Sequence, residues 1–235
     1  MSDAATSLFA RDGGAMAGLP GSPRAADAAQ AERGRLRFLE ALAEDPARRD
    51  AARALLSTEP WGGLLDAVFG YSPFLTQSII HEPELVLALP DLGFDRTFEA
   101  IREEIAALDP LTPDTAALGA RLRLIKRRTA LIVALADVAG AWPLETATLA
   151  LSDLADSAIG AVCSHLLAKL AREGRLDLNP EDPLRSSGLI VLGLGKLGAR
   201  EVAYSGDGDW RVLYDDEMGE MRDRSEMSAP FVRLA

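Results

Sequence analysis

Apolar side chains recur every three or four positions through most of residues 31–174, a spacing that predicts helices rather than strands. Pro46 breaks the first stretch. Ser72-Pro73 has the chemistry of a helix start, because serine accepts a free N–H and proline suits the first turn. The pattern predicts helices over 31–58 with a break at Pro46, around 64–69, after Ser72, and over 97–108, 115–139 and 145–173.

The two longest predicted helices distribute their apolar residues differently. Residues 131–136 are apolar on all sides and are expected to be buried, whereas the helix over 145–173 carries an apolar stripe and ends at Gly174. The first half of the helix over 115–139 holds a basic cluster. We interpret that cluster as a solvated helix face, with a phosphate or an acidic partner as the alternative ligand; its members are Arg121, Arg123, Lys126, Arg127 and Arg128.

The pattern changes after Gly174. Residues 176–187 contain two prolines and are expected to be a linker, whereas residues 189–192 and 210–214 have the composition of short strands. The predicted fold class is therefore mostly α with a C-terminal α/β piece. The predicted organisation is a flexible tail over 1–30, a helical region over 31–185, and the start of an α/β core over 186–235.

Composition narrows the functional classes. A net charge of −11 repels phosphate backbones, so we expect no nucleic-acid partner. The single cysteine, Cys163, excludes an intrachain disulfide and favours a cytoplasmic location, and two histidines are too few for a typical Cys/His zinc site. No run of about 18 apolar residues is evident, so no membrane span is expected.

A glycine-rich turn follows the first predicted strand. Gly193, Gly195 and Gly198 have G-x-G-x-x-G spacing, which is compatible with a dinucleotide site in which Asp215 would contact a ribose. Two features count against that interpretation. A helix after Gly198 has little room before the break at residues 205–208, and 21 residues after Tyr214 are too few for the further strands of a dinucleotide fold.

Two carboxylates at the entrance to the second predicted strand offer different chemistry. Side chains alternate along a strand, so Asp207 and Asp209 would point to the same side. Carboxylates so placed bind Mg²⁺, which also takes phosphate oxygens, and the glycine turn would bring backbone N–H groups to the same phosphates. The order strand, glycine turn, short helix and Asp-x-Asp is that of a nucleotidyltransferase. The alternative is that residues 205–209 form only a polar turn.

The same residues carry a family resemblance. Residues 193–209, GLGKLGAREVAYSGDGD, resemble the G-x-G-K-x-G-x-x-E-L-x-x-S-S-D-I-D-L signature of glutamine synthetase adenylyltransferase/adenylyl-removing enzymes. Residues 65–85 resemble the family's FGNSPFL segment and the hPEL segment that follows it. Residues 121–159 resemble its RR and LSDLAD segment. The matching signature positions are Gly193, Gly195, Lys196, Gly198, Glu201, Ser205, Asp207 and Asp209.

This resemblance implies a fold, a reaction and partners. It implies a polymerase-β-like nucleotidyltransferase core, here the start of the adenylyl-removing unit, which takes AMP from a tyrosine of glutamine synthetase by Mg²⁺-dependent phosphorolysis. Asp207 and Asp209 would be the catalytic, metal-binding pair. The nucleotide and phosphate would lie against Gly193, Gly195, Lys196, Gly198 and Ser205. ATP or ADP and phosphate would be substrates, and the partners would be glutamine synthetase and a nitrogen-signalling regulatory protein.

Departures from the family pattern lower the expected activity. The sequence ends before the family's later R-x-D-x-R-L-R-P-like segment with its third carboxylate, so we expect a truncated unit. Gly206 replaces a serine and Gly208 a branched residue, which would loosen the loop that carries the carboxylates. The expectation is therefore an enzyme fragment of weak activity, and the alternative is an inactive remnant that serves as a helical protein-binding module.

Overall fold

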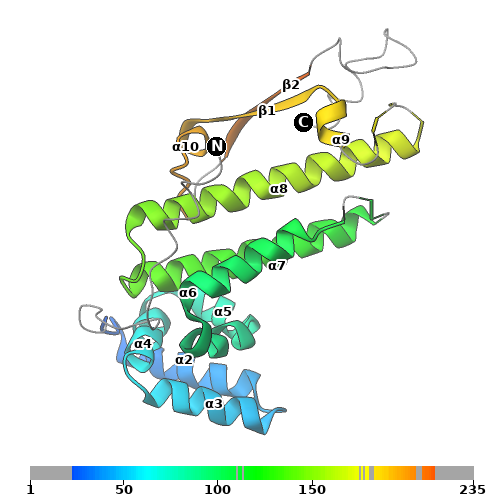
Figure 1. The fold of residues 1–235 in the computed structure, drawn as a ribbon. Coiled ribbons are helices and arrows are strands. Elements are labelled where there is room, and N and C mark those ends of the chain that lie inside the picture. Colours follow the sequence, from blue (N-terminus) through cyan, green and yellow to red (C-terminus); the bar gives the residue numbers. More distant parts are fainter. Residues whose placement is uncertain are drawn as a thin grey trace. The chain divides into compact units, whose positions relative to one another are not determined.

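Helix follows helix from Ala28 to Arg172, and a two-stranded sheet comes after them in the computed structural model (Figure 1). The structure describes residues 23–109, 111–112, 114–174, 176, 178–179, 183–204 and 208–214. Two units are distinguished, Met1–Ile101 with Lys126–Ala147, and Arg102–Ile125 with Thr148–Ala235. The elements are α2 (Ala28–Ala41), α3 (Pro46–Ser57), α4 (Trp61–Tyr71), α5 (Pro73–His81), α6 (Pro83–Ala106), α7 (Thr115–Val138), α8 (Leu144–Arg172), α9 (Pro183–Ser186), β1 (Leu189–Leu194), α10 (Gly195–Gly198) and β2 (Asp209–Tyr214).

Side-chain caps fix several helix starts. The carboxylates of Asp27 and Asp45 accept hydrogen bonds from backbone N–H groups in the first turns of α2 and α3, at 2.9 and 3.1 Å. Ser72 Oγ accepts from Leu75 N at 3.2 Å, and Pro73 is the first residue of α5, which confirms the predicted start. The helix expected from residue 31 begins at Ala28, because Asp27 caps it there.

Helix α6 is longer than the sequence pattern indicated. A helix was expected over 97–108, but helical structure begins at Pro83, a residue suited to a first turn. Pro90 lies inside this helix, and Gly93 departs from helical geometry at φ 74° and ψ 171°. These two residues resemble helix breakers in the sequence, but here they mark a kink between two consecutive helical segments.

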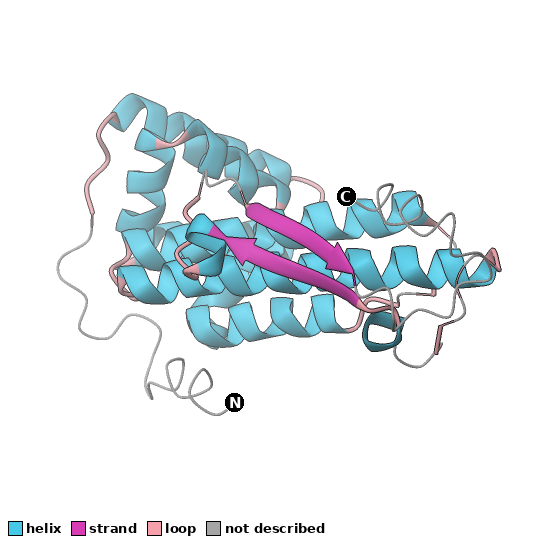
Figure 2. Ribbon diagram, turned by 90° about the horizontal axis from the view of Figure 1, so that it is seen from above, coloured by secondary structure: helices cyan, strands magenta, loops and turns pink. Residues whose placement is uncertain are grey.

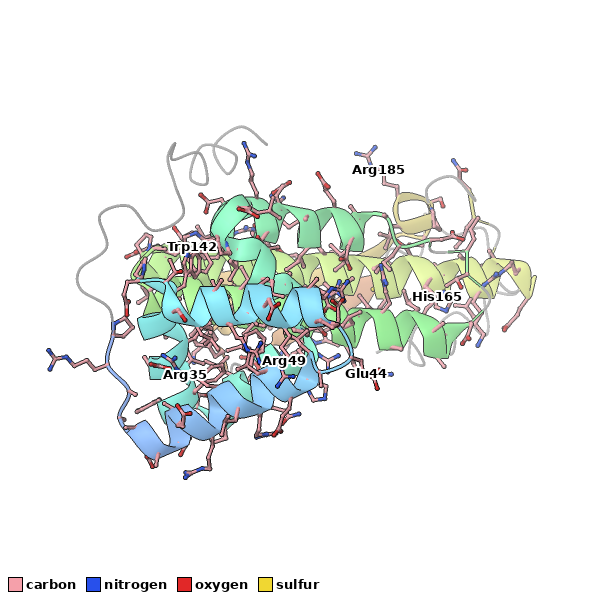
Figure 3. The ribbon with its side chains drawn as sticks, turned by 90° about the horizontal axis from the view of Figure 1, so that it is seen from below. Arg35, Glu44, Arg49, Trp142, His165 and Arg185 are labelled. Carbon is pink, nitrogen blue, oxygen red and sulfur yellow. The ribbon has the colours of Figure 1, made fainter. Side chains whose placement is uncertain are left out.

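The core of the first unit lies among α2, α4 and neighbouring helices. Phe38 of α2 and Phe69 of α4 are fully buried, with ring centroids 6.2 Å apart. Gly34 permits this close approach, because a Cβ there would lie 2.6 Å from the Phe69 side chain. The apolar run over 131–136 is buried as predicted. Trp142 Nε1 donates to Asp95 Oδ1 at 2.7 Å, and Figure 3 labels this tryptophan.

Part of the basic cluster forms ion pairs with a buried carboxylate. Glu82, whose side chain is 7% exposed, lies 3.3 Å from Arg127 Nε and accepts from Arg128 Nε at 2.8 Å. In the second unit, Arg121 lies 3.5 Å from Glu104. The interpretation as a solvated face is therefore wrong for Arg127 and Arg128, because a carboxylate as buried as Glu82 requires compensating charge. Arg121, Arg123 and Lys126 are exposed, as that interpretation predicts.

The second unit contains most of α8 and the sheet of β1 and β2. Strands β1 and β2 are antiparallel and lie side by side (Figure 2), with Val191 opposite Val212 and Leu194 opposite Asp209. Buried His165 of α8 forms a hydrogen bond with Thr115 Oγ1 at 2.9 Å (His165 is labelled in Figure 3). A small apolar cluster closes one end of the unit; it comprises Leu167, Leu170, Leu176, Leu178, Leu184 and Leu189.

Helix α8 is also apolar enough, by length and composition, to cross a membrane. It has 29 residues and a mean hydropathy of 1.3 over its most apolar 18-residue window, of which 17% is buried. Helix α8 is not an unbroken apolar run, because Ser152, Asp153 and Asp156 interrupt it, and its composition alone is weak evidence for a membrane span. The same composition is found in core helices of soluble proteins, and α8 carries Asp153 and His165, which make polar contacts inside the second unit.

Candidate functional site: a glycine turn beside Asp209

The predicted glycine turn lies between the two strands. β1 ends at Leu194, and Gly195 begins α10, a single turn. β2 begins at Asp209, which pairs with Leu194 in the antiparallel register. Because directly opposed residues of an antiparallel pair share a face, the register brings Asp209 to the residue that precedes the glycine turn.

The carboxylate of Asp209 lies against the bare Cα of Gly195. A Cβ on Gly195 would be 2.7 Å from Asp209 Oδ2, and Gly195 has a φ of +52°. Both observations favour glycine, since the left-handed backbone disfavours other residues and a methyl group would force the Asp209 carboxylate to rotate away. The missing side chain therefore lets the Asp209 carboxylate lie directly against the backbone of the glycine turn.

The other two glycines close the turn. A Cβ on Gly198 would lie 2.5 Å from the Gly193 carbonyl oxygen, so the backbone approaches too closely for any other residue. Ala199 N donates to Gly195 O at 3.0 Å, and Glu201 N donates to Lys196 O at 2.7 Å. Leu197 is 4% exposed and anchors the turn, whereas Lys196 is exposed at the surface beside it.

Gly208, immediately before β2, lies close to Leu197 of the glycine turn. A Cβ on Gly208 would lie 3.7 Å from Leu197 Cδ2, an ordinary van der Waals contact, and the residue has no positive φ. A branched side chain, which the family pattern has at this position, would therefore pack on Leu197 without strain. Its absence removes one apolar contact between the start of β2 and the glycine turn.

The structure brings together four of the predicted site residues, Gly193, Gly195, Gly198 and Asp209, with Lys196 in the same turn. Asp207 and Ser205 lie outside the described residues, and the shared face of Asp207 and Asp209 therefore stays a prediction. Within the described part of the chain there is no group of three or more His, Cys, Asp or Glu side chains able to hold a metal.

Comparison with known proteins identifies the family. Residues 63–235 match the glutamate-ammonia ligase adenylyltransferase family, and this segment includes α8, the glycine turn and Asp209. The chain belongs to this family. The resemblance inferred from the three sequence segments is thereby confirmed.

Several bacterial relatives carry one name, bifunctional glutamine synthetase adenylyltransferase/adenylyl-removing enzyme. The relative from Bradyrhizobium diazoefficiens is 35% identical over 201 residues, which are 84% of this chain and 20% of that protein. The Bartonella quintana relative is 32% identical over 197 residues, 81% of this chain and 20% of the other. A Rhodopseudomonas palustris relative is 36% identical over 171 residues, with 72% and 17% covered. The chain thus spans about a fifth of the length of these relatives.

The strand arrangement differs from that of a dinucleotide site. A dinucleotide fold requires parallel strands joined by a crossover helix, but β1 and β2 are antiparallel, and α10 has four residues. The alternative interpretation of G-x-G-x-x-G as a dinucleotide site is therefore wrong. Asp215, its predicted ribose contact, lies outside the described residues.

A cavity of about 470 Å³ lies between α8 and β1 in the second unit. Its lining is mainly apolar and includes Ile159, Gly160 and Cys163 of α8 and Leu189 and Val191 of β1. Burial raises the pKa of the Cys163 thiol above its ordinary value, so this thiol is a weak nucleophile. His165 is turned into the protein toward Thr115, as expected for residues two apart on a helix, so the two do not form a catalytic pair.

Proposed function

We propose that this chain is part of an enzyme that controls glutamine synthetase by removing AMP from a tyrosine, and that residues 186–235 begin its nucleotidyltransferase core. The observation that supports this most strongly is the placement of the Asp209 carboxylate against Gly195 of the family's glycine turn. In this proposal residues 31–185 form the helical region that carries the core. The names of the relatives give glutamine synthetase as the protein acted upon.

The proposed reaction is phosphorolysis. An oxygen of inorganic phosphate attacks the phosphorus of the AMP–tyrosine phosphodiester, and a new P–O–P bond forms as the bond to the tyrosine oxygen breaks. The products are ADP and a tyrosine hydroxyl, which takes up the proton that phosphate gives up. Atoms and charge balance without an oxidant, a reductant or a further co-reactant.

The residues of this chain have distinct tasks in the proposal. Asp209 and Asp207 would hold Mg²⁺, and backbone N–H groups of the turn that contains Gly193, Gly195 and Gly198 would bind phosphate oxygens. Lys196 would add positive charge, and Ser205 a hydroxyl donor. The ion, when bound, neutralises charge on the transferred phosphoryl group. The oxygen chemistry of the Asp209 carboxylate, which is exposed at the start of β2, fits such an ion.

The test is ADP release from purified adenylylated glutamine synthetase, with phosphate and Mg²⁺, by the 235-residue chain alone. We expect release of ADP that depends on phosphate and on Mg²⁺, because phosphate is the proposed nucleophile and the ion would neutralise charge on the transferred phosphoryl group. Asp209→Asn and Asp207→Asn should abolish it. Glu173→Gln, at the end of α8, removes the same charge and should not. Release that persists in both aspartate variants, or no release above buffer, would contradict the proposal.

A second function is favoured by one observation in the first unit. Tyr71 and Phe74, on either side of Ser72-Pro73, are 81% and 66% exposed. Exposed aromatic side chains mark protein-binding surfaces when they gather on one patch. In this alternative the chain is an inactive helical binding module for glutamine synthetase. The double variant Tyr71→Ser and Phe74→Ser should then weaken binding to purified glutamine synthetase without lowering thermal stability, and unchanged binding would exclude this role.

The cellular setting is part of the same proposal. We place the protein in the bacterial cytoplasm, where glutamine synthetase acts and where its single cysteine, Cys163, would stay reduced. A nitrogen-signalling regulatory protein is the proposed second partner. Co-purification of tagged chain with glutamine synthetase from the soluble fraction tests the location, and recovery in the membrane fraction would contradict it.

A further inference from the structure

The segment that follows the glycine turn is tied to α8 by polar contacts. We propose that Arg200, held by Asp153 and Asp156 of α8, is a positioning residue that fixes the glycine turn and the Asp209 carboxylate. The proposal deepens the proposed function by naming what holds the site in place, and only its metal-binding readout rests on that function.

Three contacts make up this anchor. Arg200 Nη2 pairs with Asp153 Oδ1, and Arg200 Nη1 lies 3.5 Å from Asp156 Oδ2. Val202 N donates to Ser152 Oγ at 3.2 Å, and that hydroxyl donates to Thr148 O at 2.8 Å. Ser152 is fully buried and the Asp153 side chain is 19% exposed, whereas the side chains of Arg200 and Asp156 are 44% and 54% exposed, so solvent partly screens the two ion pairs.

The backbone of Arg200 supports a specific role for its side chain. Arg200 has a φ of +60°, and among the described residues it is the one non-glycine residue with a positive φ. This conformation is unfavourable for a residue with a Cβ, and glycine would adopt it without that cost. A strained arginine that persists at such a position indicates that the contacts of its side chain hold it there.

A short chain of hydrogen bonds links this anchor to the candidate site. Arg200 N donates to Leu197 O at 3.1 Å, and its neighbour Ala199 N donates to Gly195 O at 3.0 Å. Gly195 in turn contacts the Asp209 carboxylate. The ion pairs of Arg200 with α8 therefore fix the orientation of the turn and of the Asp209 carboxylate beside it. In this proposal residues 151–156, the family's LSDLAD segment, position the candidate site.

The experiment removes the side chain without adding backbone strain. Arg200→Gly deletes the guanidinium and suits the positive φ, so faster exchange in this variant reports the lost contacts rather than strain. Arg200→Lys keeps the positive charge. The charge-swapped double variant, Arg200→Asp with Asp153→Arg, places the two charges of the ion pair at each other's positions. Arg53→Ala is the control, because it removes an exposed arginine–aspartate pair of 2.9 Å in the first unit.

Amide hydrogen exchange is the primary readout. We expect the amides of Ala199, Glu201 and Val202 to exchange about twofold to fivefold faster in Arg200→Gly, as the loss of a solvent-screened ion pair predicts. Arg200→Lys should retain part of the amide protection of the wild type, and the charge-swapped double variant should retain most of it. Amides of Leu167 and Leu170 in α8 should not change. Unchanged exchange at Val202, or equal acceleration throughout α8, would overturn the proposal.

Mn²⁺ binding, followed by electron paramagnetic resonance, is the second readout. Arg200→Gly should weaken Mn²⁺ binding about threefold to tenfold, and the charge-swapped double variant should bind Mn²⁺ as the wild type does. The reason is that the Arg200 ion pair acts on the metal only by positioning Asp209. Binding that is equal in wild type and Arg200→Gly would overturn the link to the site. If Asp209→Asn leaves Mn²⁺ binding unchanged, the proposed metal site is wrong. The amide hydrogen exchange of the Arg200 variants then still tests the positioning role, because it does not depend on metal.

Discussion

Replacement of Gly195 by alanine tests the geometry on which the candidate site depends. The new methyl group would lie 2.7 Å from Asp209 Oδ2 on a backbone with a φ of +52°. The left-handed backbone costs about 1 kcal/mol for alanine relative to glycine. Rotation of the carboxylate away from its preferred conformation costs about 1 kcal/mol more. We expect Gly195→Ala to lower the free energy of unfolding of the second unit by about 2 kcal/mol.

A double-mutant cycle separates the two contributions. In an Asp209→Ala background the carboxylate is absent, and the nearest remaining atom, Asp209 Cβ, lies at an ordinary contact distance of 3.8 Å. Gly195→Ala should then cost only the backbone contribution of about 1 kcal/mol, so the coupling energy is about 1 kcal/mol. Gly160→Ala is the control, because Gly160 lies inside α8 with nothing within 4 Å of its missing Cβ. That variant should stabilise the helix by about 1 kcal/mol.

Urea titrations followed by the indole NMR signals of the three tryptophans provide the assay. Trp210 lies in β2 and reports on the second unit, whereas Trp61 and Trp142 belong to the first and serve as internal references. The expected result is an earlier transition of the Trp210 signal in Gly195→Ala, with the other two signals unaltered. An equal cost of Gly195→Ala with and without the Asp209 carboxylate would refute the contact between them.

Three further predictions follow from buried and exposed groups. Glu82→Ala should destabilise the first unit by about 2–3 kcal/mol in thermal or urea unfolding, because it leaves two arginines without their shared carboxylate; a change below 0.5 kcal/mol, a typical surface effect, would show that the pairs contribute nothing. Burial raises the pKa of the Cys163 thiol. Iodoacetamide should therefore label the folded chain half-maximally at a higher pH than the urea-unfolded chain, and the free energy of unfolding should fall as pH rises from the unfolded toward the folded pKa; coincident labelling profiles would disprove this. Amides of β1 and β2 should exchange faster than those of residues 151–170, since the sheet in the described residues has two strands, a marginal arrangement, and its Ile190 is 47% exposed; equal protection would contradict it.

Local chemistry made part of this fold predictable. Ser72-Pro73 contains its own start signal, and the run over 131–136 has no polar side to expose, so both interpretations needed only neighbouring residues. The first half of α6 was missed because Pro90 and Gly93 are ordinarily breakers, and only packing shows that helices continue on both sides. Sequence spacing thus predicts elements well where one short segment decides the outcome.

The contacts that assemble the site depend on residues far apart in the chain. Arg200 pairs with Asp153 across 47 positions, and Glu82 pairs with Arg128 across 46. Nothing in the local pattern of either member identifies its partner. The contact of Asp209 with Gly195 is intermediate, because strand alternation and a short turn limited the possible registers, but the register itself is a property of the folded sheet.

The central claim is that the glycine turn and Asp209 form a metal-dependent site for a phosphate-bearing ligand. Equilibrium dialysis of labelled ADP against the chain, with and without Mg²⁺, tests it most directly. We expect ADP binding that requires Mg²⁺, weakens at least about tenfold in Asp209→Asn and in Gly195→Ala, and is unchanged in Glu173→Gln. ADP binding that is independent of Mg²⁺ and equal in all four proteins would contradict the claim.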